Sequence, residues 1–206
     1  MILPAGAGGK VGRCQAFIFL GGIKLGVSEV LEVYRNLAKF DEGVLKVLSS
    51  KYSVLSSWVD ELVNSFYDTL YSWEKTRALL EGKDRKRLER TLRDWYLTIV
   101  SGDISDDFWK RQWRVGLVHV ANGVSNLYFI SMMDFIRAFF TDKVKASFDK
   151  DEAVELIKAF NTITSVIVSL VVEGYVDAFV NLSGMDESLV HRLAQLGAQE
   201  MIDKDG

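Results

Sequence analysis

The sequence predicts an all-α fold, and three observations lead to this prediction. Apolar residues recur at steps of three and four along most of the chain, which is the spacing of one face of an α-helix. The chain contains a single proline, Pro4, so no proline interrupts a helix later in the sequence. Glycines fall mostly outside the periodic segments, and 206 residues provide enough material for one large domain with one core.

The helices are expected in a single series that follows an irregular start. Residues 1–26 are rich in glycine and have no apolar periodicity, so we expect an irregular N-terminal tail there. The segment 74–82 also has no clear periodicity and is expected to be a mixed link. The remaining segments show helical register in this order: 27–40, a short one that begins at Asp41, 52–73, 84–100, 106–120, 124–147, 151–182 and 186–201.

Local signals support the boundaries of several of these helices. Ser105, followed by Asp106 and Asp107, is a typical N-cap with an acidic first turn. The polar residues at 149–151 restart the very long helix, and Ser183-Gly184 ends it. No linker rich in Gly, Ser or Pro divides the chain. We therefore expect residues 27–206 to form one domain of seven or eight helices.

Charge and cysteine content argue against several classes of protein. A net charge of -3 is unlike that of a general nucleic-acid binder, and the single cysteine leaves no disulfide framework, which fits a reducing cytoplasmic location. The apolar run at 16–20 is too short for a signal peptide. Glu173 and Asp177 shorten the apolar run at 166–172, so we expect no membrane span.

The strongest functional signal is a lone histidine on an apolar helical stretch. His119 shares a predicted helix face with Phe108, Gln112 and Val115, and Gly116 one turn earlier would let the backbone approach something flat and bulky. No other histidine, cysteine or carboxylate stands at ligand spacing, whereas a zinc site needs four ligands. A haem iron needs only one axial ligand from the protein, so haem is the candidate cofactor.

Three motifs in a fixed order resemble those of a known family. They are Phe66-Tyr67-x-x-Leu70, Leu88-x-x-Thr91-Leu92 and Arg114-x-Gly116-x-x-His119. Their order and separation, within residues 41–180, resemble the globin-sensor family, which includes the sensor domains of globin-coupled sensors, protoglobins and related single-domain globins. This resemblance implies a globin fold with an extra N-terminal helix, a haem b cofactor, and a homodimer formed through the last two long helices, 124–147 and 151–182.

The resemblance also implies roles for individual residues. His119 would be the proximal ligand of the haem iron, and Tyr67 in the distal pocket would donate a hydrogen bond to a bound gas. Thr91 would place a hydroxyl near the same gas. The other expected cofactor-binding residues are Leu88, Trp95, Arg114 and Gly116.

The chain departs from the family pattern in places. Tyr128-Phe129 stands where members often have a tryptophan-tyrosine pair, and Phe66-Tyr67 replaces the Trp-Tyr pair common in archaeal protoglobins. Trp95 occupies a position where a polar residue near a haem propionate is sometimes found. No kinase, cyclase or methyl-accepting domain follows in the sequence, so the sensor role is less supported than the globin fold.

Each candidate residue also has a purely structural interpretation. His119 could be a core histidine bonded to a carbonyl, Tyr67 could bury its ring and bond water or a carbonyl, and Thr91 could bond its own preceding turn. Four aromatic residues would line a flat slot or form ordinary core: Phe66, Trp95, Phe108 and Trp109. Arg114 and six basic residues could either pair with the haem propionates or form a solvated face. The six are Lys83, Arg85, Lys86, Arg87, Arg90 and Arg93.

The favoured function is that of a haem-binding globin that reversibly binds a diatomic gas at a His119-ligated iron, as a gas sensor or carrier. Dioxygen is the first candidate gas, with CO and NO as alternatives. Two other functions stay open. One is a non-haem globin-fold regulatory module, against which His119 counts. The other is a haem enzyme of the nitric oxide dioxygenase or peroxidase type, for which the chain has no reductase domain and no second distal histidine.

Overall fold

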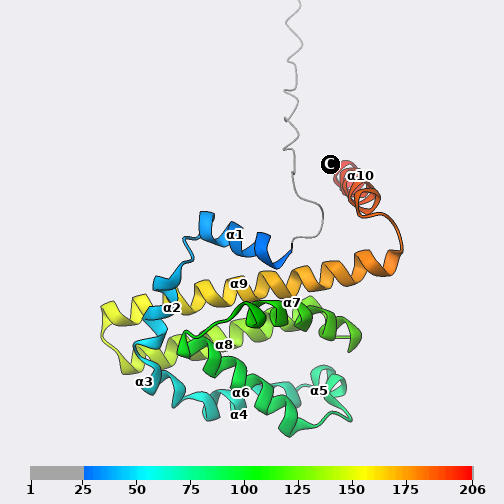
Figure 1. The fold of residues 1–206 in the computed structure, drawn as a ribbon. Helices are drawn as coiled ribbons and strands as arrows, with labels where there is room; N and C mark the ends of the chain where they lie inside the picture. Colours follow the sequence, from blue (N-terminus) through cyan, green and yellow to red (C-terminus); the bar gives the residue numbers. More distant parts are fainter. Residues whose placement is uncertain (1–25, 206) are drawn as a thin grey trace, which may run out of the picture.

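The computed structural model describes residues 26–205, and the described chain is helical with no β-strand (Figure 1). The predicted tail at 1–26 lies outside the described residues except for Gly26, which precedes the first helix. Ten helices follow one another in the described part: α1 Val27–Leu37, α2 Glu42–Ser49, α3 Tyr52–Ser56, α4 Val59–Ser72, α5 Glu74–Leu80, α6 Arg85–Ser101, α7 Asp106–Ala121, α8 Asn126–Ser147, α9 Lys150–Ser183 and α10 Glu187–Asp205.

Side-chain caps set the starts of the helices that matter most for the site. The Asp84 carboxylate accepts a hydrogen bond from the N–H of Arg87 (3.2 Å) at the start of α6. The Ser105 hydroxyl accepts one from the N–H of Phe108 (3.3 Å) at the start of α7, as predicted. Each cap satisfies a backbone donor that has no partner within its own helix. The cap at Ser105 was expected from the sequence, whereas Asp84 was expected only as the first residue of a helical segment.

Two regions differ from the sequence-based expectation. The predicted helix at 52–73 is divided into α3 and α4, because the N–H groups of Ser57 and Trp58 bond the carbonyls three residues earlier, at 3.1 and 3.4 Å, and tighten the chain there. The mixed link at 74–82 contains helix α5, which begins after Trp73 takes an extended conformation. Apolar periodicity continues through 57–58 and so did not reveal the break there, whereas the lack of clear periodicity at 74–82 concealed helix α5.

Helix α9 forms the centre of the core. It packs against α7, α8, α2 and α1 and crosses the body of the molecule in Figure 1. Its most deeply buried side chains include Phe160, Ile163, Val166 and Leu170. By length and composition, the helix is long and apolar enough over 150–181 to cross a membrane. The sequence had led us to expect that Glu173 and Asp177 would make its apolar run too short for this. More than half of its apolar stretch (56%) is buried inside the fold, as in the core helix of a globular domain.

A backbone contact fixes α7 against α9. A Cβ atom added at Gly116 would lie 2.2 Å from the carbonyl oxygen of Val171, and one added at Gly174 would lie 2.2 Å from the carbonyl oxygen of Trp113. Only glycine therefore fits at either position. Because His119 lies one turn after Gly116, this crossing determines where the histidine stands.

Helix α10 lies beyond the C-terminal end of α9 and apart from the other helices (Figure 1). It leaves large apolar side chains exposed, among them Leu193, Leu196 and Met201. His191 lies on this helix, where its ring bonds the side chain of Gln195 (2.7 Å). The second histidine of the chain is therefore remote from the helices that surround His119.

Candidate functional site

A cavity of about 350 Å³ lies among α4, α5, α6, α7 and α8, with residues of α9 at its base. Its volume falls within the range of small-molecule pockets, which is about 300–1,000 Å³. Apolar and aromatic side chains form most of its wall, such as Leu70, Leu92, Val115, Phe129 and Ile167. Such a wall suits a ligand whose body is apolar.

His119 lines this cavity from the last turn of α7. Its ring packs against Phe129 (ring centroids 5.4 Å apart) and Tyr175 (6.2 Å). Burial lowers the pKa of His119 to about 4, so the imidazole is neutral at pH 7. Its Nδ1 atom is buried and has no hydrogen-bond partner in the described part of the chain. A neutral imidazole is the form of histidine that binds metals.

The orphaned Nδ1 atom has an energetic meaning. A buried polar atom without a partner costs about 1–3 kcal/mol, and it is uncommon enough in folded proteins to require an explanation. Among the described residues no hydrogen bond joins the ring to a carbonyl, which is the bond that a purely structural histidine would be expected to form. The other ring nitrogen, Nε2, also makes no hydrogen bond within the described chain, and because His119 lines the cavity it is this nitrogen that a ligand could reach.

Tyr67 reaches the same cavity from α4. Its residue is only 6% exposed, and its ring packs edge to face on Phe66 (5.2 Å). Burial, aided by the Glu89 carboxylate, raises the pKa of Tyr67 well above its ordinary value, so the hydroxyl stays protonated. No hydrogen bond to this hydroxyl is found among the described residues. The structure thus brings a free O–H donor and a neutral imidazole to one apolar cavity.

The two polar side chains of α6 that line the cavity, Thr91 and Trp95, are already engaged in hydrogen bonds. The Thr91 hydroxyl donates to the carbonyl of Arg87 (3.0 Å), so its only proton is used within its own helix. Trp95 donates through Nε1 to Oε1 of Gln112 (3.1 Å), which ties α6 to α7. Leu88, Thr91 and Trp95 all line the cavity, yet neither polar group among them has a donor left for a ligand.

Two of the predicted site residues do not face the cavity. Gly116 packs against the backbone of α9, so the close approach expected at this residue is made to a helix. Arg114 is exposed and is not among the lining residues. Phe108 and Trp109 also pack elsewhere, with Phe40 in the core. Helix α7 thus turns one face to α9 and another to solvent, and only part of its surface lines the cavity.

Sequence reasoning also missed part of the wall. Residues of α5 and α8 contribute Leu79, Leu80, Met132, Met133 and Ile136. The α5 pair was hidden in the segment expected to be a link. The residues of α8 stand at helical spacing after His119, which indicates a buried face but not what that face contacts.

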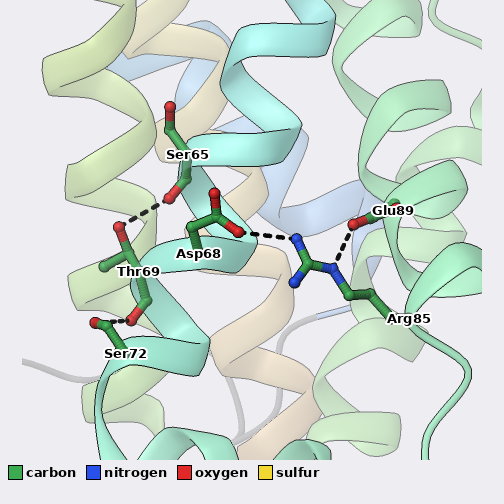
Figure 2. Close-up of polar contacts among 6 residues, drawn as sticks. All are labelled: Ser65, Asp68, Thr69, Ser72, Arg85 and Glu89. Carbon is green, nitrogen blue, oxygen red and sulfur yellow. Dashed lines mark hydrogen bonds and ion pairs between the residues drawn. The ribbon is translucent and has the colours of Figure 1, made fainter.

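Of the basic residues near α6, only Lys83 lines the cavity. Arg85 is held between Asp68 (2.9 Å) and Glu89 (2.6 Å), as Figure 2 shows, and Arg93 pairs with Asp60. Lys86, Arg87 and Arg90 are exposed and lie outside the lining. The structure therefore distinguishes one basic residue from the six that the sequence offered.

The described residues contain no group of three or more histidine, cysteine, aspartate or glutamate side chains that could hold a metal ion. Within the described chain, a metal held by His119 would therefore need most of its other ligands from a cofactor. A haem meets this condition, because the porphyrin supplies four nitrogens and the protein one axial ligand. Apolar walls, a neutral imidazole with an orphaned nitrogen and a free phenol all fit such a group.

Comparison with known proteins identifies the fold. The globin domain of a Geobacter sulfurreducens globin-coupled sensor is 22% identical, with a TM-score of 0.65, covering 73% of this chain and 98% of that domain. The globin domain of Escherichia coli DosC, in its ferric form, is 12% identical with a TM-score of 0.53, covering 64% of this chain and 94% of that one. The predicted all-α globin fold is confirmed.

Sequence comparison gives the family. An uncharacterized protein of Methanocaldococcus jannaschii is 27% identical over 96 residues, which are 45% of this chain and 50% of that protein, so the chain spans about half the length of this curated relative. The protoglobin family model matches residues 28–181, which include all three motifs and every residue that lines the cavity. On this match, the chain belongs to the protoglobin family.

Proposed function

We propose that this protein binds haem b in the cavity, with His119 as the axial ligand of the iron, and that it reversibly binds a diatomic gas there. The observation that carries the proposal is the neutral imidazole of His119, which lines the apolar cavity and makes no hydrogen bond within the described chain. Membership of the protoglobin family supports the same function. Dioxygen is the first candidate gas, with CO and NO as alternatives.

The residues of the cavity have separable tasks in this proposal. A bound haem supplies an iron with an open coordination position, which is where a diatomic gas binds. His119 would hold the iron from α7, and the apolar walls would exclude water from the gas. The Tyr67 hydroxyl, protonated and unengaged, would donate a hydrogen bond to the bound gas and stabilise it by about 1–3 kcal/mol.

We further propose that the protein acts as a gas sensor or carrier and as a cytoplasmic homodimer. The sensor role is supported by similarity to the globin domain of a globin-coupled sensor. The homodimer would form through α8 and α9, which expose Leu127 (70%), Ile130 (40%) and Phe179 (64%). Apolar side chains of this size are commonly covered in a protein–protein interface.

Visible absorption spectra test the proposal directly. We expect the purified protein, as isolated or after addition of haem, to show a Soret band that shifts on reduction under oxygen and again under carbon monoxide. His119→Ala should lose this spectrum or most of the bound haem. The chain has only two histidines, so His191→Ala is the matched control and should keep the wild-type spectrum.

Either of two results would contradict the proposal. Wild-type protein that retains no haem after the unbound haem is removed would rule out the haem function and favour the non-haem interaction module. Wild-type and His119→Ala proteins with the same haem content and the same spectrum would show that His119 is not the axial ligand.

A further inference from the structure

The cavity has one charged residue in its wall. Of the residues that line it in the described chain, Lys83 alone carries a charge. Lys83 lies in the turn between α5 and α6, and its side chain is exposed to solvent at that edge. The cavity therefore has an apolar body and a single cation at its rim.

A hydrogen bond holds this cation across the opening. Lys83 donates through Nζ to Oδ1 of Asn122 at 2.5 Å, and Asn122 caps the C-terminal end of α7, three residues after His119. Asn122 also lines the cavity, and its own Nδ2 donates to the carbonyl of Val118 (2.6 Å). The α5–α6 turn and the end of the histidine helix are joined at the rim.

The partner of Lys83 is neutral, so its charge stays uncompensated. No carboxylate pairs with Lys83 among the described residues, whereas Arg85 is neutralised by Asp68 and Glu89 (Figure 2). An ammonium group has three N–H donors, and the Asn122 amide oxygen uses one of them. Two donors and a full positive charge remain for an anion at the solvent edge of the cavity.

We infer that Lys83 binds a carboxylate of the ligand whose apolar body fills the cavity. This inference rests on the proposed function, in which that carboxylate is a haem propionate. A haem placed with its propionates at the rim would keep both charges near water and bury only its apolar part. Lys83 would then be a positioning residue, because it sets the orientation of the haem without contacting the iron.

The test combines a change in the protein with a matched change in the ligand. Lys83→Met removes the charge and keeps the length of the side chain, and Lys83→Arg keeps the charge. Lys86→Met is the control, because Lys86 is an exposed basic residue three positions away that does not line the cavity. The equilibrium affinity of each apoprotein is measured by absorption titration with haem and with haem dimethyl ester, in which both propionates are uncharged.

We expect Lys83→Met to weaken haem binding about three- to tenfold. This loss lies between that expected for removal of an exposed ion pair and that expected for removal of a hydrogen bond to a charged group. Lys83→Arg and Lys86→Met should stay within about twofold of wild type. The dimethyl ester should bind wild type and Lys83→Met equally, and 1 M salt should narrow the difference seen with haem.

Three results would overturn the assignment, each for a different reason. Equal haem affinity of wild type and Lys83→Met would show that Lys83 takes no part, while the proposed function would stand. Equal weakening of haem and its dimethyl ester by Lys83→Met would show that Lys83 acts only through the fold. Wild-type protein that binds neither compound would remove the proposed function and this inference with it.

Discussion

Replacing Gly116 with alanine should loosen the contact between α7 and α9. The added Cβ would lie 2.2 Å from the carbonyl oxygen of Val171 and 2.9 Å from the Cα of Gly174. Both atoms belong to the backbone, so no side-chain rotation can relieve the clash. The two helices must therefore separate at the point where they approach most closely.

The size of the effect follows from two opposing contributions. Overpacking in a well-packed core costs about 1–3 kcal/mol, and a clash with a rigid backbone belongs at the upper end of this range. Alanine is favoured over glycine within a helix by about 0.5–1 kcal/mol, which offsets part of that cost. We expect Gly116→Ala to lower the free energy of unfolding by about 2 kcal/mol.

Urea unfolding followed by far-ultraviolet circular dichroism measures this change. Gly197→Ala is the control, because a Cβ at Gly197 on α10 meets nothing within 4 Å, and it should leave the midpoint unchanged or slightly higher. The double variant Gly116→Ala/Gly174→Ala should lose less than the sum of the two single losses, since the first substitution already separates the helices. A Gly116→Ala midpoint equal to that of wild type would refute the close contact.

Two further predictions concern the buried polar groups of the cavity. Burial lowers the pKa of His119 from 6.5 to about 4. Between these two pH values the unfolded chain binds a proton that the folded chain does not. The free energy of unfolding should therefore fall by up to about 3 kcal/mol as the pH drops from 6.5 to 4. Urea midpoints across this range should show a smaller decline in His119→Phe than in wild type, and parallel declines would contradict the prediction. Tyr67→Phe should remove one hydrogen bond to the bound gas and so speed dioxygen dissociation from the haem-loaded protein by about fivefold to 100-fold. Stopped-flow measurements give this rate, and an unchanged rate would exclude Tyr67 as the donor.

The sequence predicted the parts of the site that depend on local pattern. His119 and Tyr67 stand in motifs whose order resembled one family, and both line the same cavity. The start of α7 was visible because Ser105 is a typical N-cap residue and caps the helix in the structure. Local pattern was enough wherever the determining contact lies within a few residues.

The sequence could not reveal features that depend on distant contacts. Gly116 indicated a close approach, but its neighbour on α9 lies more than fifty residues away along the chain. Six basic residues looked equivalent until the carboxylates of Asp68 and Glu89 were seen to hold Arg85. The tight turn at 57–58 is made by backbone bonds that leave the apolar spacing intact. Each of these requires the fold to be known first.

The backbone contact between Gly116 and Gly174 gives the cavity walls unequal stiffness. Residues of α7 cannot retreat from an incoming ligand unless α9, the central helix, moves with them. On the other side, α5 packs mainly against α4, and Gly82 in the turn after it has open space around it. A bulkier ligand would therefore be accommodated by displacement of α5 and this turn, which only the exposed Lys83–Asn122 hydrogen bond ties to α7. The cavity is rigid near His119 and deformable at the rim. The largest ligand that it can hold is therefore determined at the rim, far from the imidazole that would bind the ligand.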